Sequence, residues 1–195
     1  MAMPRVRSTS ESPPVPERSM WTFADLEQLP DYGNRYEILH GELLVTPLPA
    51  HGHQAVSMRL ALKLGAWCAA NPGWSVRAFG GVYVRETLWF EPDIAVYPTP
   101  EYLELPWKEM PPPMLAVEVL SSATRARDRH RKRPEYIRHG VGEVWLVDRD
   151  TRVVERWTAA SEFPETHVDG IAWTPDAALP TLSIALDELF GPNVE

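Results

Sequence analysis

Two carboxylates in this sequence stand within or directly beside apolar runs. Glu118 interrupts the apolar segment 114–120, and Asp93 follows Pro92 immediately before the apolar residues 94–96. An ionised carboxylate within an apolar strand needs a partner, and two carboxylates on neighbouring strands repel each other unless a cation lies between them. A hard divalent ion held by oxygen ligands would satisfy both groups. These two residues therefore predict an acidic metal site, although a Pro-Asp pair is more commonly a turn or strand-entry motif.

A helix that follows the apolar run should bring a cation to Glu118. Residues 121–124 offer three hydroxyls that could cap this helix. Asp128, Lys132 and Tyr136 then recur every four residues, which places them on one helical face. Lys132 could form an exposed pair with Asp128, worth only a few tenths of a kcal/mol. The carboxylates nearby favour the other interpretation, in which Lys132 points at the acidic site.

Glu37, Glu42 and His53 are further candidates, each with an ordinary structural alternative. A hairpin over residues 36–45 that turns at His40-Gly41 puts both glutamates on one face beside leucines. This predicts a half-buried acidic spot, but the glutamates could also lie at the surface. His53 follows a glycine near a helix start, where a capping or core histidine is more common than a functional one.

The segment that contains Lys132 is strongly basic. Residues 125–139 carry six Arg and one Lys against Asp128 and Glu135, a local charge of +5 in a chain with a formal net charge of −8. Such a run is most often a solvated helix, but its density in an acidic chain also favours phosphate binding. The nucleic-acid contacts expected from it are Arg125, Arg129 and Arg133.

Composition limits the class of protein. With 195 residues, of which 44% are apolar and 24% charged, the chain can form one sizeable core. The single cysteine, Cys68, excludes an internal disulfide and favours a reducing cytoplasm. Residues 1–20 hold no apolar block of signal-peptide length, so we expect a flexible N-terminal tail and no membrane insertion. Residues 21–195 are expected to form a single domain.

The remaining pattern predicts an α/β (α+β) fold. Capped helices are expected at 22–29 and 51–70, strands at 74–84, 94–97, 114–120, 143–148, 152–157 and 182–185, and a last helical turn at 186–190. The proline-rich segment 98–113 is expected to be a loop. The strand–helix–strand unit from 114 to 148 should form a parallel crossover.

An ordered set of motifs resembles the bacterial Uma-two family of endonucleases, which is placed in the PD-(D/E)XK restriction-endonuclease-like superfamily. The motifs are YEILHGE at 36–42, His53, Pro92-Asp93, VEVLS at 117–121, Asp128-x-x-x-Lys132-x-Pro134-x-Tyr136 and GVGEVWLVD at 140–148. The resemblance covers about residues 20–190. The set in this order is much more specific than any one of its members.

The resemblance implies a restriction-endonuclease-like mixed β-sheet core with flanking helices. It also implies hydrolysis of phosphodiester bonds at one site that holds Mg²⁺ or Mn²⁺. Asp93 matches the aspartate of the superfamily motif and Glu118 its second acidic residue. Glu42 matches an acidic residue from the N-terminal element that would help to hold the metal, and Glu37 is the less favoured candidate for that role.

The position of the catalytic lysine departs from the superfamily pattern. Leu120 stands where the superfamily has lysine. In the resembling family this lysine is found on the following helix, where Lys132 stands here. Lys132 would orient the attacking water or stabilise the charge that develops at phosphorus. Asp128, Tyr136 and His53 are secondary candidates for the same site.

The expected partner is nucleic acid, with DNA preferred, and the sequence leaves the choice between DNA and RNA open. No base-reading module is recognisable in the sequence, and cleavage of both duplex strands from one site per chain would favour a homodimer. Two alternatives remain open. Leu120 and the acidic net charge would allow a catalytically silent nucleic-acid or protein-binding module on the same fold. A phosphoesterase for small nucleotides would instead have a closed pocket.

Overall fold

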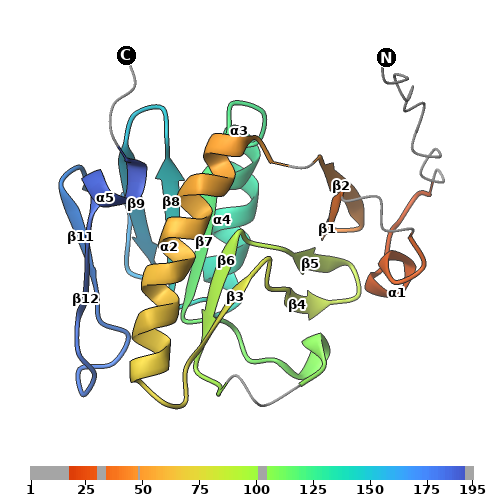
Figure 1. The fold of residues 1–195 in the computed structure, drawn as a ribbon. Helices are drawn as coiled ribbons and strands as arrows, with labels where there is room; N and C mark the ends of the chain where they lie inside the picture. Colours follow the sequence, from red (N-terminus) through yellow and green to blue (C-terminus); the bar gives the residue numbers. More distant parts are fainter. Residues whose placement is uncertain (1–17, 30–33, 48, 101–104, 192–195) are drawn as a thin grey trace, which may run out of the picture.

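The computed structural model describes residues 18–29, 34–47, 49–100 and 105–191 (Figure 1). Most of the expected tail, residues 1–17, lies outside this described part, as does the centre of the proline-rich loop at 101–104. Strands and helices mix along the chain as the sequence predicts, and the strands form two larger sheets and one small one.

A six-stranded mixed sheet forms the centre of the fold. Its order is β10 (Glu165–His167), β9 (Val153–Thr158), β8 (Glu143–Asp148), β7 (Leu115–Leu120), β6 (Ile94–Tyr97) and β3 (Ser75–Ala78). Strands β7 and β8 pair in parallel, which confirms the predicted crossover, and the other pairs are antiparallel. The mixed sheet of the predicted fold class is thus present.

The predicted hairpin belongs to a separate four-stranded sheet. Its order is β2 (Glu42–Thr46), β1 (Arg35–Leu39), β5 (Leu88–Phe90) and β4 (Val82–Arg85). The hairpin register pairs Leu39 with Glu42 and Glu37 with Leu44, as expected. A third pair, β11 (Gly170–Trp173) and β12 (Leu182–Ala185), is antiparallel.

The prediction of one strand over 74–84 is wrong. The chain leaves the central sheet after β3 and enters the four-stranded sheet as β4, and Gly80-Gly81 lies between them. Gly81 allows this passage because a Cβ there would lie only 1.7 Å from the Trp89 ring. The two glycines therefore mark a change of sheet.

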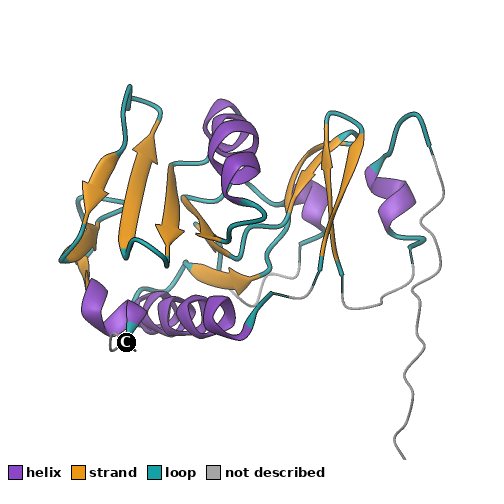
Figure 2. Cartoon of the chain, turned by 90° about the horizontal axis from the view of Figure 1, so that it is seen from above, coloured by secondary structure: helices purple, strands orange, loops and turns teal. Residues whose placement is uncertain are grey.

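Helices cover both faces of the central sheet, as Figure 2 shows from above. Helix α2 (His51–Ala70) lies on one face, and the segment α3 (Arg125–Arg127), η2 (Asp128–Lys132) and α4 (Arg133–Arg138) lies on the other. The remaining helices are α1 (Phe23–Leu26), η1 (Trp107–Glu109) and α5 (Leu186–Phe190). Among the described residues, no helix is both long and apolar enough to span a membrane.

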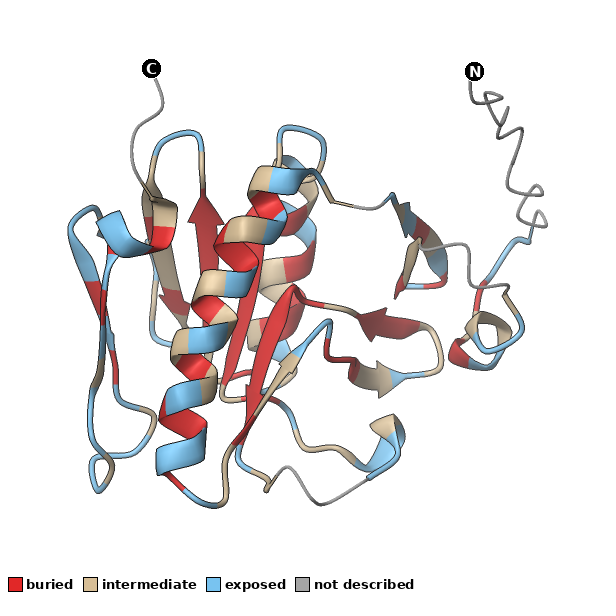
Figure 3. Ribbon diagram, in the orientation of Figure 1, coloured by how far each residue is buried: buried red, intermediate tan, exposed pale blue. Residues whose placement is uncertain are grey.

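Strand β7 contributes side chains to both helical layers. Leu115, Val117 and Val119 pack in the same core cluster as α2. Ala116 and Leu120 pack on the opposite face with Tyr136 and its neighbours. The central strands are buried along their length (Figure 3), and all six residues of β7 are buried. This alternation points the Glu118 side chain at the α3–α4 layer.

Candidate active site

Asp93 and Glu118 lie next to each other on neighbouring strands. Asp93 immediately precedes β6, Glu118 lies in β7, and the antiparallel register pairs Ile94 with Val117. The amide of Val119 donates a hydrogen bond of 2.7 Å to Oδ2 of Asp93, which fixes the carboxylate beside β7. Both acidic residues line a pocket of about 260 Å³, which we term the acidic pocket.

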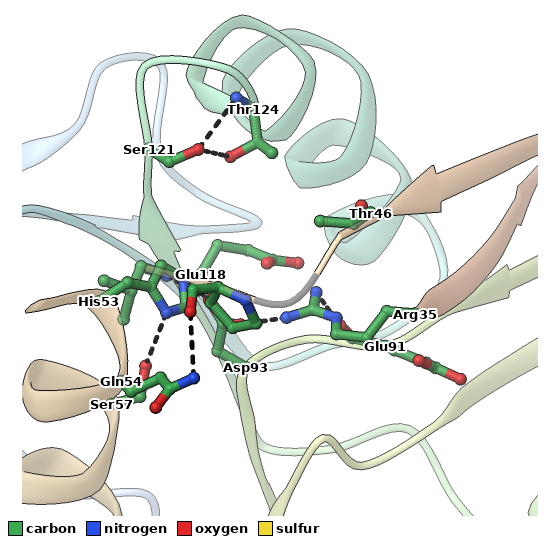
Figure 4. A network of polar contacts seen from close by, with 12 residues as sticks. Arg35, Thr46, His53, Gln54, Ser57, Glu91, Asp93, Glu118, Ser121 and Thr124 are labelled. Carbon is green, nitrogen blue, oxygen red and sulfur yellow. Dashed lines mark hydrogen bonds and ion pairs between the residues drawn. The ribbon is translucent and has the colours of Figure 1, made fainter. Parts of the chain in front are cut away.

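The Asp93 carboxylate is held from two more sides (Figure 4). The Arg35 guanidinium forms an ion pair with Oδ1, and Nε2 of His53 lies 3.1 Å from Oδ2. The other ring nitrogen of His53 lies 3.4 Å from the hydroxyl of Ser57. Burial opposes ionisation of Asp93, but the hydrogen bond from His53 and the charge of Arg35 outweigh it and lower the pKa of Asp93.

Lys132 bridges Glu118 and Glu37 in the interior. Its Nζ lies 2.6 Å from Oε1 of Glu118 and 2.6 Å from Oε1 of Glu37, and its side chain is 1% exposed. The Tyr136 hydroxyl donates a hydrogen bond of 2.6 Å to the same Glu118 oxygen. The expectation that Lys132 turns toward the acidic residues is confirmed, since Oδ1 of Asp128 is farther away, at 3.9 Å.

The chain reaches this arrangement through one π-helical turn. Segment η2 (Asp128–Lys132) is π-helical between two α-helical stretches, and π turns inside α-helices occur frequently at functional sites. Both ends of the turn are buried, with Asp128 3% and Lys132 0% exposed. The turn therefore brings a carboxylate and an ammonium to the same side of the helix.

Protonation of the pair follows from burial and charge. Burial raises the pKa of the Glu118 carboxyl, and the neighbouring carboxylates of Asp128 and Asp93 raise it further, while the Lys132 ammonium opposes this. Burial alone would lower the pKa of Lys132, but Glu118 and Glu37 outweigh it and raise that pKa. Lys132 thus keeps its charge and stabilises the ionised form of Glu118.

Seven charged side chains gather around these groups, and we term them the charged cluster. The carboxylates are Glu37, Asp93, Glu118 and Asp128, and the cations are Arg35, Arg127 and Lys132. Four carboxylates thus stand beside three cations in this cluster. Two buried oxygens, Oε2 of Glu37 and Oδ1 of Asp128, have no hydrogen-bond partner among the described residues.

Glu42 lies away from the cluster, contrary to expectation. Its side chain is 55% exposed and pairs with Arg131 at 2.5 Å. The hairpin register is as predicted, but β2 is the edge strand of its sheet, so Glu42 faces solvent while Glu37 in the neighbouring strand is fully buried. Glu37, the less favoured candidate, is therefore the hairpin carboxylate that joins the charged cluster.

The three arginines expected to hold nucleic acid are engaged within the protein. Arg125 pairs with Asp148 and Asp150, and Arg129 pairs with Glu155. The third, Arg133, lies with its guanidinium carbon 3.9 Å from the centroid of the Trp157 ring. The basic run is thus largely compensated by the β8–β9 hairpin and is a weaker phosphate surface than its composition indicates.

Three arginines that the sequence did not single out for this site line the acidic pocket instead. They are Arg35, Arg127 and Arg149. Arg149 lies at the tip of the β8–β9 hairpin, and a Cβ added to Gly52 would lie 2.6 Å from its guanidinium. No partner for the Arg149 guanidinium is found in the described part of the chain. These residues stand in unrelated sequence contexts, so their shared location appears only in the fold.

The acidic pocket has donors that suit a hard divalent ion. Asp93 and Glu118 both offer carboxylate oxygens, and Mg²⁺ commonly takes one or two carboxylates and several waters. Within the described residues, no three acidic, histidine or cysteine side chains already form a metal-binding group. The residues therefore fit Mg²⁺ or Mn²⁺ with two protein ligands, and Glu42 is not one of them in this structure.

Comparison with known proteins gives the family of this chain and one structure with the same fold. The crystal structure of "a putative nuclease belonging to DUF820 from Anabaena variabilis ATCC 29413" superposes with a TM-score of 0.70 at 19% sequence identity, covering 87% of this chain and 97% of that one. It shows that the two chains share a fold. Curated protein sequences gave no match. The family model Uma2, described as "Putative restriction endonuclease", matches residues 23–187. This match spans most of the sequence, and the chain therefore belongs to the Uma2 family.

Proposed function

We propose that this protein is a metal-dependent endonuclease that hydrolyses phosphodiester bonds of nucleic acid, with DNA as the expected substrate. The observation that carries the proposal is the placement of Asp93 and Glu118 on adjacent strands at one pocket. The description of the Uma2 family supports the same activity, as does the printed name of the structural relative from Anabaena variabilis.

Asp93 and Glu118 would hold Mg²⁺ or Mn²⁺ in the acidic pocket. The bound ion would polarise the scissile phosphate and acidify a water molecule. Arg35 and His53 would keep Asp93 ionised and oriented through the contacts they already make. These residues touch Asp93 from two sides, so they limit its rotation when the substrate binds.

Lys132 would act through Glu118 and not on the phosphate. It lies behind Glu118, is 1% exposed and does not line the acidic pocket. We therefore assign Lys132 as a positioning residue that orients Glu118 and favours its ionised form, together with the hydroxyl of Tyr136. Arg127 and Arg149, which do line the pocket, would contact the phosphates that flank the cleaved bond.

Cleavage of labelled single-stranded and duplex DNA and RNA, with Mg²⁺, Mn²⁺ or a chelator, tests the proposal. Wild-type protein should cleave at least one of these substrates when the metal is present. Loss of one metal ligand should reduce the rate by about 100-fold or more, on the scale of losing one transition-state electrostatic contact. Glu118→Gln and Asp93→Asn are the variants, each compared with wild type at a temperature where both are folded.

Glu86→Gln serves as the matched control because Glu86 is an exposed carboxylate that pairs with Lys108 outside the acidic pocket. It should cleave at the wild-type rate. Calorimetric titration with Mn²⁺ gives a second readout, since Glu118→Gln should weaken metal binding. Nucleic-acid binding without cleavage under any metal condition would replace the proposal by the catalytically silent binding module that the same fold allows.

A further inference from the structure

A second pocket adjoins the acidic pocket on the side of α2. It has a volume of about 330 Å³, and we term it the apolar pocket. Its walls include Met58, Ala78, Phe79 and Ile94. Pro49, His53 and Asp93 line both pockets, so a chain bound across Asp93 would extend from one into the other.

Phe79 is held in this pocket in an unfavourable backbone conformation. Its φ is +55°, in the left-handed region that a bulky side chain rarely adopts, and its side chain is 49% exposed. Gly80 and Gly81 follow it, yet neither has a positive φ. A glycine at position 79 would remove this strain and leave less apolar surface in water. Strain of this kind indicates a functional reason for the side chain.

Phe79 is also tied to the candidate active site. Its amide donates a hydrogen bond of 3.0 Å to the carbonyl oxygen of Asp93. The guanidinium carbon of Arg35 lies 5.6 Å from the Phe79 ring centroid, and the same guanidinium pairs with the Asp93 carboxylate. The ring therefore has a fixed position relative to the proposed metal ligands.

We propose that the apolar pocket binds one unpaired nucleobase, stacked on Phe79, next to the phosphodiester held at Asp93 and Glu118. Bases of a duplex are stacked inside the helix, so the substrate would be single-stranded or locally unpaired nucleic acid. The pocket suits a base because it is mainly apolar and has a few polar groups, Gln54, Ser57 and His53, for the polar edge. This inference rests on the proposed function, which places the phosphodiester at Asp93.

Binding of a short labelled oligothymidylate, and of an abasic strand of the same length, tests this inference by fluorescence anisotropy in a chelating buffer. Base stacking on an aromatic side chain predicts that Phe79→Gly weakens oligothymidylate binding by about 5- to 140-fold. The abasic strand should bind both proteins equally, because it has no base to stack. Phe79→Trp should keep the wild-type preference for oligothymidylate.

Phe163→Gly is the matched control, since Phe163 is 75% exposed and belongs to the β9–β10 connection at the opposite edge of the central sheet from β3. It should leave binding of both strands unchanged. Phe79→Gly should unfold at the same or a higher temperature than wild type, because it relieves backbone strain.

The inference is wrong if Phe79→Gly binds oligothymidylate as wild type does, if it weakens binding of both strands equally, or if wild type binds neither strand. Failure of the proposed function is a separate result. A preference for oligothymidylate that depends on Phe79, combined with no cleavage under any metal condition, would retain the base pocket and remove the endonuclease activity. Metal-dependent cleavage, combined with no effect of Phe79→Gly on binding, would retain the endonuclease activity and remove the base pocket.

Discussion

At the scale of single residues, the Lys132 ammonium bridges two buried carboxylates. Glu118 and Glu37 are buried, each within 2.6 Å of Nζ. Removal of one partner from a buried ion pair leaves an uncompensated charge, which costs about 3–5 kcal/mol. Lys132→Ala should therefore lower the free energy of unfolding by about that amount, measured by urea denaturation near neutral pH.

Arg131→Ala provides the comparison for this prediction. Arg131 is the adjacent residue and also pairs with a glutamate, but both side chains of the Arg131–Glu42 pair are about half exposed. Exposed pairs contribute about 0.2–1 kcal/mol. If Lys132→Ala cost no more than Arg131→Ala, the buried Lys132 pairs would contribute no more than an exposed pair, and the assignment of Lys132 as the residue that supports Glu118 would be wrong.

Single residues are predictable from the sequence where their polarity conflicts with that of their neighbours in the chain. Glu118 was recognisable because a carboxylate within an apolar run must be compensated, and Lys132 because helical spacing limits where it can point. The choice between Glu37 and Glu42 could not be made in this way. Strand alternation puts both on one face, and what separates them is that β2 lies at a sheet edge, which depends on pairing with distant strands.

At the scale of secondary structure, the π-helical turn η2 sets the angle between two parts of one helix. Deletion of His130, an exposed residue within the turn, should convert it to regular α-helix. Each residue contributes about 100° of rotation, so Arg129 and Asp128 would rotate away from their present partners relative to Lys132. We expect the free energy of unfolding to fall by about 1–3 kcal/mol, measured by chemical denaturation.

His130→Ala is the control for the deletion, because it removes an exposed side chain and keeps the length of the turn. It should change the free energy of unfolding by less than about 0.5 kcal/mol. Helical content by circular dichroism should be similar in both variants. A deletion variant as stable as His130→Ala would show that the π turn has no part in positioning the charged cluster.

Element prediction was most accurate where the pattern is local. Helix α2 (His51–Ala70) follows from its helical periodicity. The parallel β7–β8 pair follows from the rule that a strand–helix–strand connection joins parallel strands of one sheet. The short strand β5 (Leu88–Phe90) was not predicted. It has only three residues, and its partners β1 and β4 come from other parts of the chain, so no local pattern defines it.

At the scale of the whole molecule, the distribution of charge determines how nucleic acid could approach. The formal net charge is −8, and the arginines of the basic helix are largely compensated by acidic residues of the protein. Arg127 and Arg149 remain at the acidic pocket, where a bound strand would meet them. The interaction surface for phosphate is therefore expected at the pocket and not along the helix.

This distribution predicts a shallow dependence of binding on salt. Two phosphate contacts on a single strand, at about −0.7 each, give a slope of about −1.4 for log K against log salt. Arg149→Ala should reduce the magnitude of this slope by about 0.7. Arg149 has no protein partner among the described residues, so its guanidinium can contact a phosphate. Arg131→Ala should leave the slope unchanged, since Arg131 pairs with Glu42 outside the pocket. Anisotropy titrations of a labelled single strand across a salt series measure all three slopes. If the slope changed in Arg131→Ala and not in Arg149→Ala, the phosphate contacts would lie on the basic helix and the prediction would be wrong.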